Sequence, residues 1–269
     1  MGSGIAQVSA QSGYRTIQFD LSGEMIEKSS KGIDMSLSKL VERGKMSAEE
    51  KQAILDRILF TTRAEDCVAD MIIEAIIEKK EAKVDLFTQL AALNSIDTIL
   101  ATNTSSIPVS EIAVAVPHPE RVVGIHFFNP APLMKLVEVI QGHATSSEVM
   151  QQTINISKEM GKVPVVCKDA PGFIVNRIAR PYYIEALRLV EEGIADYSTI
   201  DTLMQSCGFK MGPFRLMDLI GNDVNYAVSC SVYEQLGKPE RLKPSPIQKE
   251  KVAAGKLGRK TGEGYYIYQ

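Results

Sequence analysis

The chain of 269 residues has no tryptophan, three histidines and only four cysteines. The cysteines stand at Cys67, Cys167, Cys207 and Cys230, without a C-x-x-C pair and without a histidine at ligand spacing. This scatter argues against a zinc site and against a disulfide framework, and it indicates reduced thiols in packed positions. We therefore expect no bound metal.

Long apolar runs and an excess of one charge are also absent. No apolar stretch approaches the ~20 residues of a membrane span, and residues 1–4 lack the features of a signal peptide. The net charge is −3 with acidic and basic residues interspersed, which disfavours a nucleic-acid partner. With 45% hydrophobic residues, the chain can form one large or two medium domains. We expect a cytoplasmic protein that binds neither nucleic acid nor membrane.

In the first half of the chain, short apolar runs alternate with helical patterns. This alternation predicts βαβ units and an α/β, Rossmann-like domain with a mostly parallel sheet. Ser47 and Glu50 have the spacing of a capping box before a helix through Ile54 and Leu55. The other expected elements are strands at 16–19, 71–73, 98–101 and 121–125, and helices over 22–43 and 78–93.

The pattern changes at Asp169-Ala170-Pro171-Gly172, after which strand signals almost disappear. We predict a Rossmann-like domain over 1–169 and an all-helical domain over 170–269. The first helix of the second domain should run from about Pro171 towards Gly193, with a kink or a break at Pro181. Its expected apolar stripe consists of Ile174, Ile178, Tyr182 and Leu187.

Residues 1–13 predict a small-residue helix that ends at Gly13, followed by a strand that ends before Asp20. In a Rossmann unit an acid at this place binds the ribose hydroxyls and favours NAD over NADP, although Asp20 also suits a simple strand-end turn. Gly2 could only be the third glycine of the fingerprint. The first strand and the G-x-G turn, roughly ten residues, are missing. We expect them upstream of Met1 in the reading frame, and we expect this chain to bind NAD poorly.

His126 and Glu138 are the candidate acid–base pair. His126 follows the β-branched run 121–125, and the carboxyl ends of strands carry the chemistry of α/β folds. Glu138 shares one face of an alternating segment with Leu136 and Ile140, where a carboxylate needs a partner. The alternative is a core histidine with structural partners and an edge-strand carboxylate that faces water.

Several motifs in this order resemble the 3-hydroxyacyl-CoA dehydrogenase family, especially its bacterial 3-hydroxybutyryl-CoA members, over essentially the whole chain. The motifs are ATNTSS at 101–106, HFFNP at 126–130, MKLVEV at 134–139, PGFIVNR at 171–177, MGPF at 211–214 and LGRKTGEGYY at 257–266. The resemblance implies NAD-dependent oxidation of a (3S)-3-hydroxyacyl-CoA to the 3-oxoacyl-CoA, or the reverse reduction, on short chains such as 3-hydroxybutyryl-CoA.

In that reaction the resemblance makes His126 the general base for the 3-hydroxyl proton, with Glu138 fixing its tautomer. It also implies that Ser105 hydrogen-bonds the substrate oxygen and that Asn176 reaches in from the helical domain, so that the active site lies in the cleft between the domains. Without the family match, Ser105 is equally a turn hydroxyl and Asn176 a helix-start residue.

The same resemblance assigns the remaining site residues and a homodimer through the helical domain. The positions that match the NAD site, beside Gly2, Asp20 and Ser105, are Glu78, Lys83, Asn103, Asn129 and Lys260. Ser36 and Arg43 match positions that contact CoA, as Ser105 and Asn176 match those that bind the acyl substrate; arginine stands where the family leads us to expect lysine. For Glu78, Lys83 and Arg43, an ordinary solvated helix charge is the alternative.

Two other functions remain open. The chain could be a non-catalytic NAD- or acyl-CoA-binding relative, which the missing glycine turn favours. It could also be a dehydrogenase of hydroxy acids that does not need CoA. The presence of His126, Glu138, Ser105 and Asn176 together favours the enzyme.

Overall fold

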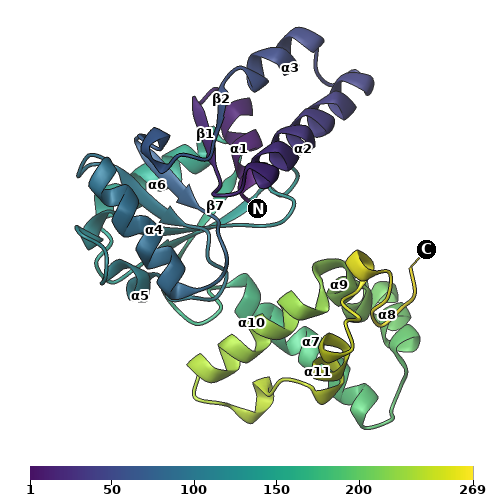
Figure 1. Ribbon diagram of the computed structural model, residues 1–269. Helices are drawn as coiled ribbons and strands as arrows, with labels where there is room; N and C mark the ends of the chain where they lie inside the picture. The colour runs from purple at the N-terminus through teal and green to yellow at the C-terminus, as the bar shows by residue number, and fades with distance from the viewer. Residues whose placement is uncertain (269) are drawn as a thin grey trace. The chain divides into compact units, whose positions relative to one another are not determined.

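The computed structural model describes residues 1–268 and divides into two compact units (Figure 1). The first unit runs from Met1 to Ala170, and the second begins at Pro171. The first combines a mostly parallel sheet with flanking helices, and the second is built of helices. The expected fold class, a Rossmann-like domain followed by a helical domain, is therefore confirmed.

The first unit alternates helices and strands along the chain. Its elements are α1 (Gly2–Gln11), β1 (Thr16–Phe19), α2 (Gly23–Glu42), α3 (Ala48–Leu55), β2 (Ile58–Thr61), β3 (Met71–Glu74), α4 (Lys80–Leu93), β4 (Ile99–Thr102), α5 (Val109–Ala113), β5 (Val122–Phe127), β6 (Leu136–Gln141), α6 (Ser147–Glu159) and β7 (Val163–Lys168). The four expected strands are present within a residue or two, and Ser47 and Glu50 form the expected capping box of α3.

The strands form two sheets instead of one. Strands β1 and β2 pair in parallel, and the second sheet has the order β3-β4-β5-β6-β7. Within the second sheet only the β5–β6 pair is antiparallel. Among the described residues no backbone ladder joins β1 to β3, so the two sheets meet through side chains.

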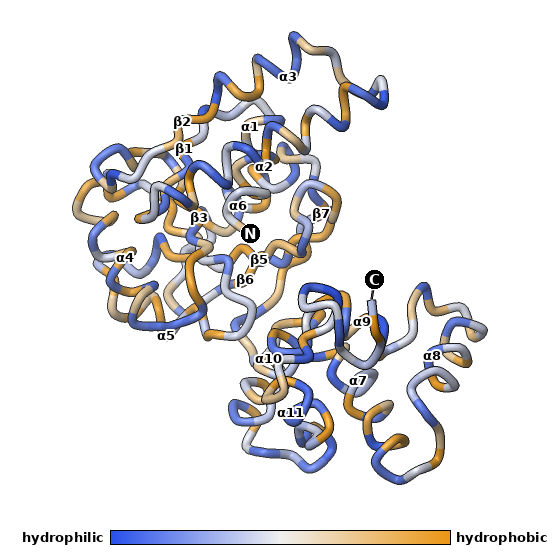
Figure 2. Tube along the Cα trace, turned by 45° about the vertical axis from the view of Figure 1, so that its right-hand side comes forward, coloured by the Kyte–Doolittle hydropathy of each residue, from blue (hydrophilic) through white to orange (hydrophobic). Residues whose placement is uncertain are grey.

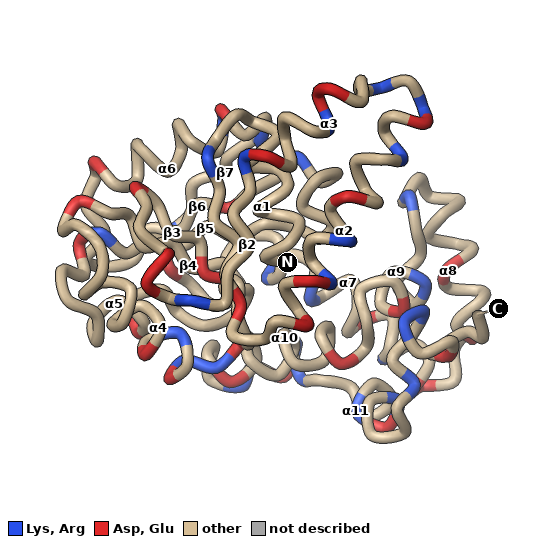
Figure 3. Tube along the Cα trace, turned by 45° about the horizontal axis from the view of Figure 1, so that its top comes forward, with Lys and Arg blue, Asp and Glu red and all other residues tan. Residues whose placement is uncertain are grey.

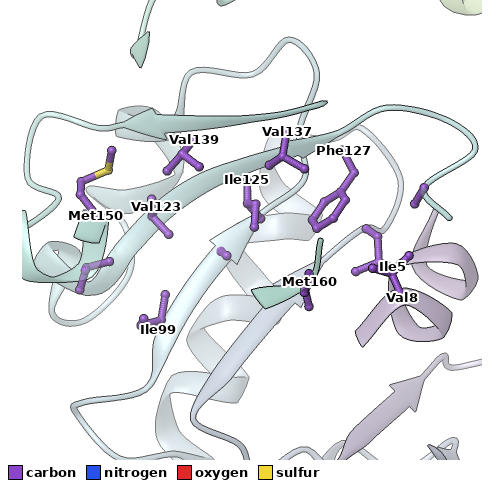
Figure 4. Packing of buried hydrophobic residues seen from close by; sticks show 13 residues of the cluster. Ile5, Val8, Ile99, Val123, Ile125, Phe127, Val137, Val139, Met150 and Met160 are labelled. Carbon is purple, nitrogen blue, oxygen red and sulfur yellow. The ribbon is translucent and has the colours of Figure 1, made fainter. Parts of the chain in front are cut away.

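Helix α1 connects the two sheets because it is apolar on two faces. Ile5 and Val8 pack with the β-branched residues of β4, β5 and β6 (Figure 4). Ala6 and Ala10 pack instead against α2, α3 and β2. Small side chains on the second face allow the close approach of the neighbouring helices. One helix thus contributes to both hydrophobic clusters.

The second sheet is covered on both faces. Val123, Ile125 and Phe127 of β5 point into the cluster with α1 and α6, as Figure 4 shows for Val123 and Ile125. The alternate residues lie on the opposite face, where Val109 of α5 packs against Gly124 so closely that a Cβ there would lie 2.8 Å from its side chain. His126 shares this second face by the period-2 rule for strands.

Two expectations for the first unit were incomplete. Strand β2 was not predicted, because its four residues, with Leu59 exposed, give too short a signal next to α3. The helix over 78–93 begins only at Lys80, so Glu78 lies in the connection before it. The helix expected over 22–43 is confirmed as α2, with the Ser22 hydroxyl accepting from the Met25 amide.

The second unit is helical apart from two isolated bridges near its C-terminal end. Its α-helices are α7 (Val175–Glu191), α8 (Tyr197–Ser206), α9 (Pro213–Ile220), α10 (Asn222–Gln235) and α11 (Pro246–Ala253). The first of these contains Pro181 without a break, so that alternative is wrong. The predicted stripe is also wrong at Ile178, which is 73% exposed; the buried face of α7 carries Tyr183, Ile184 and Leu187.

A buried carboxylate fixes the C-terminal segment of the second unit. Asp218 of α9 accepts from the backbone amides of Tyr265 and Tyr266 at 2.9 and 3.0 Å and from the Tyr268 hydroxyl at 2.9 Å. Position 264 of this segment must be glycine, because a Cβ there would lie 2.0 Å from an Asp218 oxygen.

Charge and hydropathy follow this architecture. Strands of the second sheet are largely apolar, whereas helices such as α2 alternate between polar and apolar residues (Figure 2). Acidic and basic residues are interspersed along both units (Figure 3). Among the described residues, no helix has the length and apolar character to cross a membrane.

Candidate active site

His126 and Glu138 form a buried pair across two antiparallel strands. They are direct partners in the β5–β6 register, and His126 Nδ1 lies 2.7 Å from Glu138 Oε2. Directly opposite residues in antiparallel strands have Cβ atoms about 4.5–5.5 Å apart, which suits an imidazole and a carboxylate in contact. His126 is 7% exposed and Glu138 fully buried. The carboxylate that the alternation placed among apolar neighbours therefore has its partner.

The charge of Glu138 also affects the pKa of a cysteine on the neighbouring strand β7. Cys167 of β7 is close enough that burial, together with the negative charge of Glu138, raises the pKa of its thiol to about 12. The Cys167 thiol is thus held in its neutral form. On the other side of the histidine, the ring of Phe128 lies 4.6 Å from the imidazole, between ring centroids.

Asn103 ties the end of β4 to the end of β5. Its side-chain oxygen accepts from the backbone amide of Phe127 at 2.8 Å, next to His126. Its own backbone amide donates to the Glu74 carbonyl at 2.8 Å, at the end of β3. These two bonds fasten the carboxyl ends of three adjacent strands and place the loop with Ser105 beside the strand end that carries His126.

Glu78 organises the loop that follows β4. One of its carboxylate oxygens accepts from the Thr104 hydroxyl at 2.6 Å and from the backbone amides of Ser105 and Ser106 at 2.9 and 3.1 Å. Burial alone would raise the pKa of Glu78, but the charge of Lys83 and these hydrogen bonds outweigh it, and the net pKa is lowered. Glu78 is therefore held as an anion that supports the Ser105 loop.

Lys83 lies behind this arrangement and not at its surface. Its side chain is 1% exposed, and its ammonium is 2.7 Å from a Glu74 oxygen and 3.2 Å from a Glu78 oxygen. The prediction that Lys83 contacts NAD, and the alternative that it is a solvated helix charge, both assume an exposed ammonium. Its burial in an ion-pair network argues against the solvated charge, and the contact with NAD stays a prediction.

Glu74 is the residue that sequence reasoning missed. It ends the apolar run of β3 and gave no sign of a role, yet it is 2% exposed and both its oxygens are engaged. A single carboxylate at the end of an otherwise apolar strand, nine residues before a lysine on the following helix, is the signal that could have found it.

The residues expected around the cofactor fit an anionic dinucleotide in part. Helix α1 begins at Gly2, and no side chain caps its first amides, which leaves donors of the kind that bind a pyrophosphate. Gly2 lies between β1 and the end of β3, since a Cβ there would be 3.5 Å from the Gln18 amide nitrogen. Asp20 follows β1 directly, and one of its oxygens accepts from the Ser22 amide.

The other predicted residues of the first unit are more exposed. Asn129 is exposed and precedes Pro130 in a cis peptide. Ser36 is half-buried in the middle of α2 and Arg43 is exposed at its C-terminal end. Seven residues separate Ser36 from Arg43, so they share one side of the helix. The shared side is compatible with one extended ligand.

Two predicted residues belong to the second unit. Asn176 lies in the first turn of α7, where its backbone oxygen accepts from Arg180 at 3.0 Å. Lys260 follows the α11 segment, and its ammonium forms an ion pair with Asp223 at 2.6 Å. The Asp223 carboxylate is thereby a competitor for any other anion at Lys260.

Parallel strands joined by helices, with an acid directly after β1, fit a dinucleotide-binding fold, which a helical unit follows here. Residues 1–170 match the NAD binding domain of 3-hydroxyacyl-CoA dehydrogenase, and residues 172–268 match the C-terminal domain of the same enzymes. The chain belongs to the 3-hydroxyacyl-CoA dehydrogenase family. NAD is accordingly the cofactor of its first domain.

Individual relatives agree over the full chain. It is 47% identical to the 3-hydroxyadipyl-CoA dehydrogenase of Escherichia coli, of which it spans only 57%. It is 43% identical to the probable 3-hydroxybutyryl-CoA dehydrogenase of Deinococcus radiodurans and spans 96% of that protein. The crystal structure of (S)-3-hydroxybutyryl-CoA dehydrogenase from Ralstonia eutropha is similar with a TM-score of 0.95 at 37% identity, covering 100% of this chain and 95% of the other.

Proposed function

We propose that this protein oxidises the 3-hydroxyl group of a short-chain (3S)-3-hydroxyacyl-CoA to the ketone, or catalyses the reverse reduction. The observation that carries the proposal is the buried contact of 2.7 Å between His126 Nδ1 and Glu138 Oε2. A base of this kind, next to the strand ends where α/β folds bind their ligands, suits removal of a hydroxyl proton.

In the proposed mechanism His126 takes the hydroxyl proton at Nε2, because Nδ1 faces the carboxylate. Glu138 accepts a hydrogen bond from Nδ1–H, which keeps the neutral ring in the required tautomer and stabilises the imidazolium that forms. Ser105 and Asn176 donate hydrogen bonds to the substrate oxygen as its negative charge develops. NAD, held by the first domain, would supply the acceptor for the hydride that leaves C3.

The proposed cofactor contacts use the groups described above. The first amides of α1, from Gly2 onward, and the carboxylate of Asp20 suit a pyrophosphate and ribose hydroxyls respectively. Asn129 and Lys260 are proposed further contacts, and Glu78, Lys83 and Asn103 support the loop that carries Ser105. Ser36 and Arg43 are proposed to contact the CoA portion of the substrate from α2.

A steady-state assay of NADH formation tests this function. We expect turnover of 3-hydroxybutyryl-CoA, none of free 3-hydroxybutyrate, and a loss of roughly 10²–10⁴-fold in His126→Gln. Because one relative is named for 3-hydroxyadipyl-CoA, that substrate belongs in the same assay. Equal rates with and without CoA would favour a hydroxy-acid dehydrogenase, and binding without turnover would favour a non-catalytic relative.

We further propose a homodimer that forms through the second unit. Apolar side chains on this unit are exposed, including Ile178 at 73% and Leu203 at 61%. These side chains are candidates for the interface, and the dimer itself is what the resemblance to the family implies. Light scattering after size exclusion should give twice the chain mass, and Leu203→Arg should lower it, whereas Val114→Arg in the first unit should not.

The four cysteines are all unpaired. Reduced thiols in a family of metabolic enzymes support our proposal of a cytoplasmic location. Recovery of the protein from an oxidising compartment would contradict it.

A further inference from the structure

Glu74 is a buried carboxyl group with both side-chain oxygens in hydrogen bonds. It is the last residue of β3 and is 2% exposed. Its Oε1 accepts from the Lys83 ammonium and from the Ile76 amide, each at 2.7 Å, and its Oε2 accepts from the Thr102 hydroxyl at 2.7 Å. These donors come from β4, from α4 and from the turn after β3, so the carboxylate fixes all three relative to one another.

Lys83 connects Glu74 to Glu78 through its ammonium group. A buried ammonium is costly unless it is paired, and here it is shared between two carboxylates, at 2.7 Å from Glu74 and 3.2 Å from Glu78. The second oxygen of Glu78 holds the backbone of the Ser105 loop. A continuous series of polar contacts therefore leads from Glu74 through Lys83 and Glu78 to the amides of Ser105 and Ser106.

The charges explain why Glu74 is needed in this series. With Glu74 present, the Lys83 ammonium is held between two carboxylates, 2.7 Å from a Glu74 oxygen and 3.2 Å from a Glu78 oxygen. Without the charge of Glu74, the lysine is free to approach Glu78 fully. Any such movement shifts the support of the second Glu78 oxygen, so the contacts of Glu78 with the loop amides weaken, as they would if Lys83 itself were replaced.

We propose that Glu74 is a positioning residue for the reaction, which sets the place of the Ser105 loop through Lys83 and Glu78. The inference rests on the proposed function, in which the Ser105 hydroxyl donates to the substrate oxygen. Glu74 itself touches neither substrate nor cofactor, since it is buried beneath the loop.

A double-mutant cycle with Glu74→Gln and Ser105→Ala tests the proposal. In the otherwise unchanged protein, Glu74→Gln should lower kcat about tenfold and change KM for the acyl-CoA less than about threefold, because the lost contact acts mainly in the transition state. In the Ser105→Ala background the same substitution should lower kcat less than about twofold, because residues that act through one contact are not additive. Additive losses would overturn the proposal.

Hydrogen exchange gives a readout that does not depend on activity. The amides of Ser105 and Ser106 should exchange at least about tenfold faster in Glu74→Gln, as they lose a fixed acceptor. The matched control is Glu111→Gln, which breaks the exposed pair of Glu111 with Lys80, 3.0 Å in length, and should change neither the exchange nor kcat. Unchanged exchange in Glu74→Gln would also overturn the proposal.

The two readouts separate this inference from the proposed function. A wild-type protein without 3-hydroxyacyl-CoA turnover would refute the proposed function. The hydrogen-exchange experiment would still test whether Glu74 positions the Ser105 loop. Should Glu74→Gln fail to fold, the same measurements apply to Glu74→Gln combined with Lys83→Met, which replaces the buried ion pair by neutral side chains. That variant should show the same faster exchange at Ser105 and Ser106, and protection equal to wild type would contradict the proposal.

Discussion

His126 and Glu138 are opposite residues of the antiparallel strands β5 and β6, and their side chains meet at 2.7 Å. The pairing means that the strand register itself sets their distance. Replacement of the Glu138 carboxylate by an uncharged amide of the same shape should therefore affect the chemistry more than the fold. We expect Glu138→Gln to lower kcat by about 10–10⁴-fold, since an amide can stabilise the wrong tautomer of the imidazole.

Steady-state kinetics and a thermal melt together check this expectation. The matched control is Glu111→Gln on α5, which removes a carboxylate of the same type, 55% exposed and away from the pair. A Glu138→Gln protein with the kcat of the wild type would show that the histidine does not need its carboxylate.

Glu78 should make stability depend on pH. Its pKa is lowered in the folded protein, so the folded state favours the ionised form. The stabilisation it supplies is present above the unfolded pKa of about 4.3 and is lost as the pH falls through the lower folded value. In Glu78→Gln, the free energy of unfolding should depend less on pH between about 5 and 3. Denaturant titrations at several pH values measure this; parallel curves for both proteins would contradict it.

Lys162 should stabilise the loop after the HFFNP motif. Its buried ammonium donates to the carbonyl oxygens of Ala131 and Met134 at 2.6 and 3.0 Å, and burial lowers its pKa. Lys162→Met removes both donors, so we expect a loss of roughly 1–3 kcal/mol in the free energy of unfolding. The exposed Lys158→Met is the control, and equal melting temperatures of the two variants would argue against the role.

Asp218 should be the main attachment of the C-terminal segment. Asp218→Asn replaces an acceptor of several hydrogen bonds with a group that also donates, and we expect a loss of roughly 1.5–3 kcal/mol. The same change at the helix cap Asp196 should cost much less, because asparagine caps helices as well as aspartate does. Chemical denaturation of both variants compares them, and a smaller loss at Asp218 than at Asp196 would refute this assignment.

The sequence predicted the strand positions of His126 and Glu138, because the residue pattern around both is regular. The alternation around Glu138 and the β-branched run before His126 were enough to expect both residues on strands. The antiparallel register that makes them partners could not be read, because it depends on how the connection between β5 and β6 turns the chain back.

Charged residues were the least predictable. Lys83 follows a helical pattern and was expected near the surface, but its burial is decided by Glu74 and Glu78, which approach from outside the helix. At Pro181 the break is wrong, and the kink stays a prediction. The helix continues through it because Tyr183 and Leu187 pack into the core and compensate for one missing hydrogen bond.

The division of the first unit into two sheets has a thermodynamic consequence. Strands β1 and β2 with α2 and α3 are coupled to β3–β7 by the packing of α1, and side-chain packing resists partial opening less than a shared ladder does. This part should behave as a separate foldon that unfolds first under mild denaturation. Ser36 and Arg43 lie on it, so a ligand that engages α2 would suppress that subglobal opening by mass action.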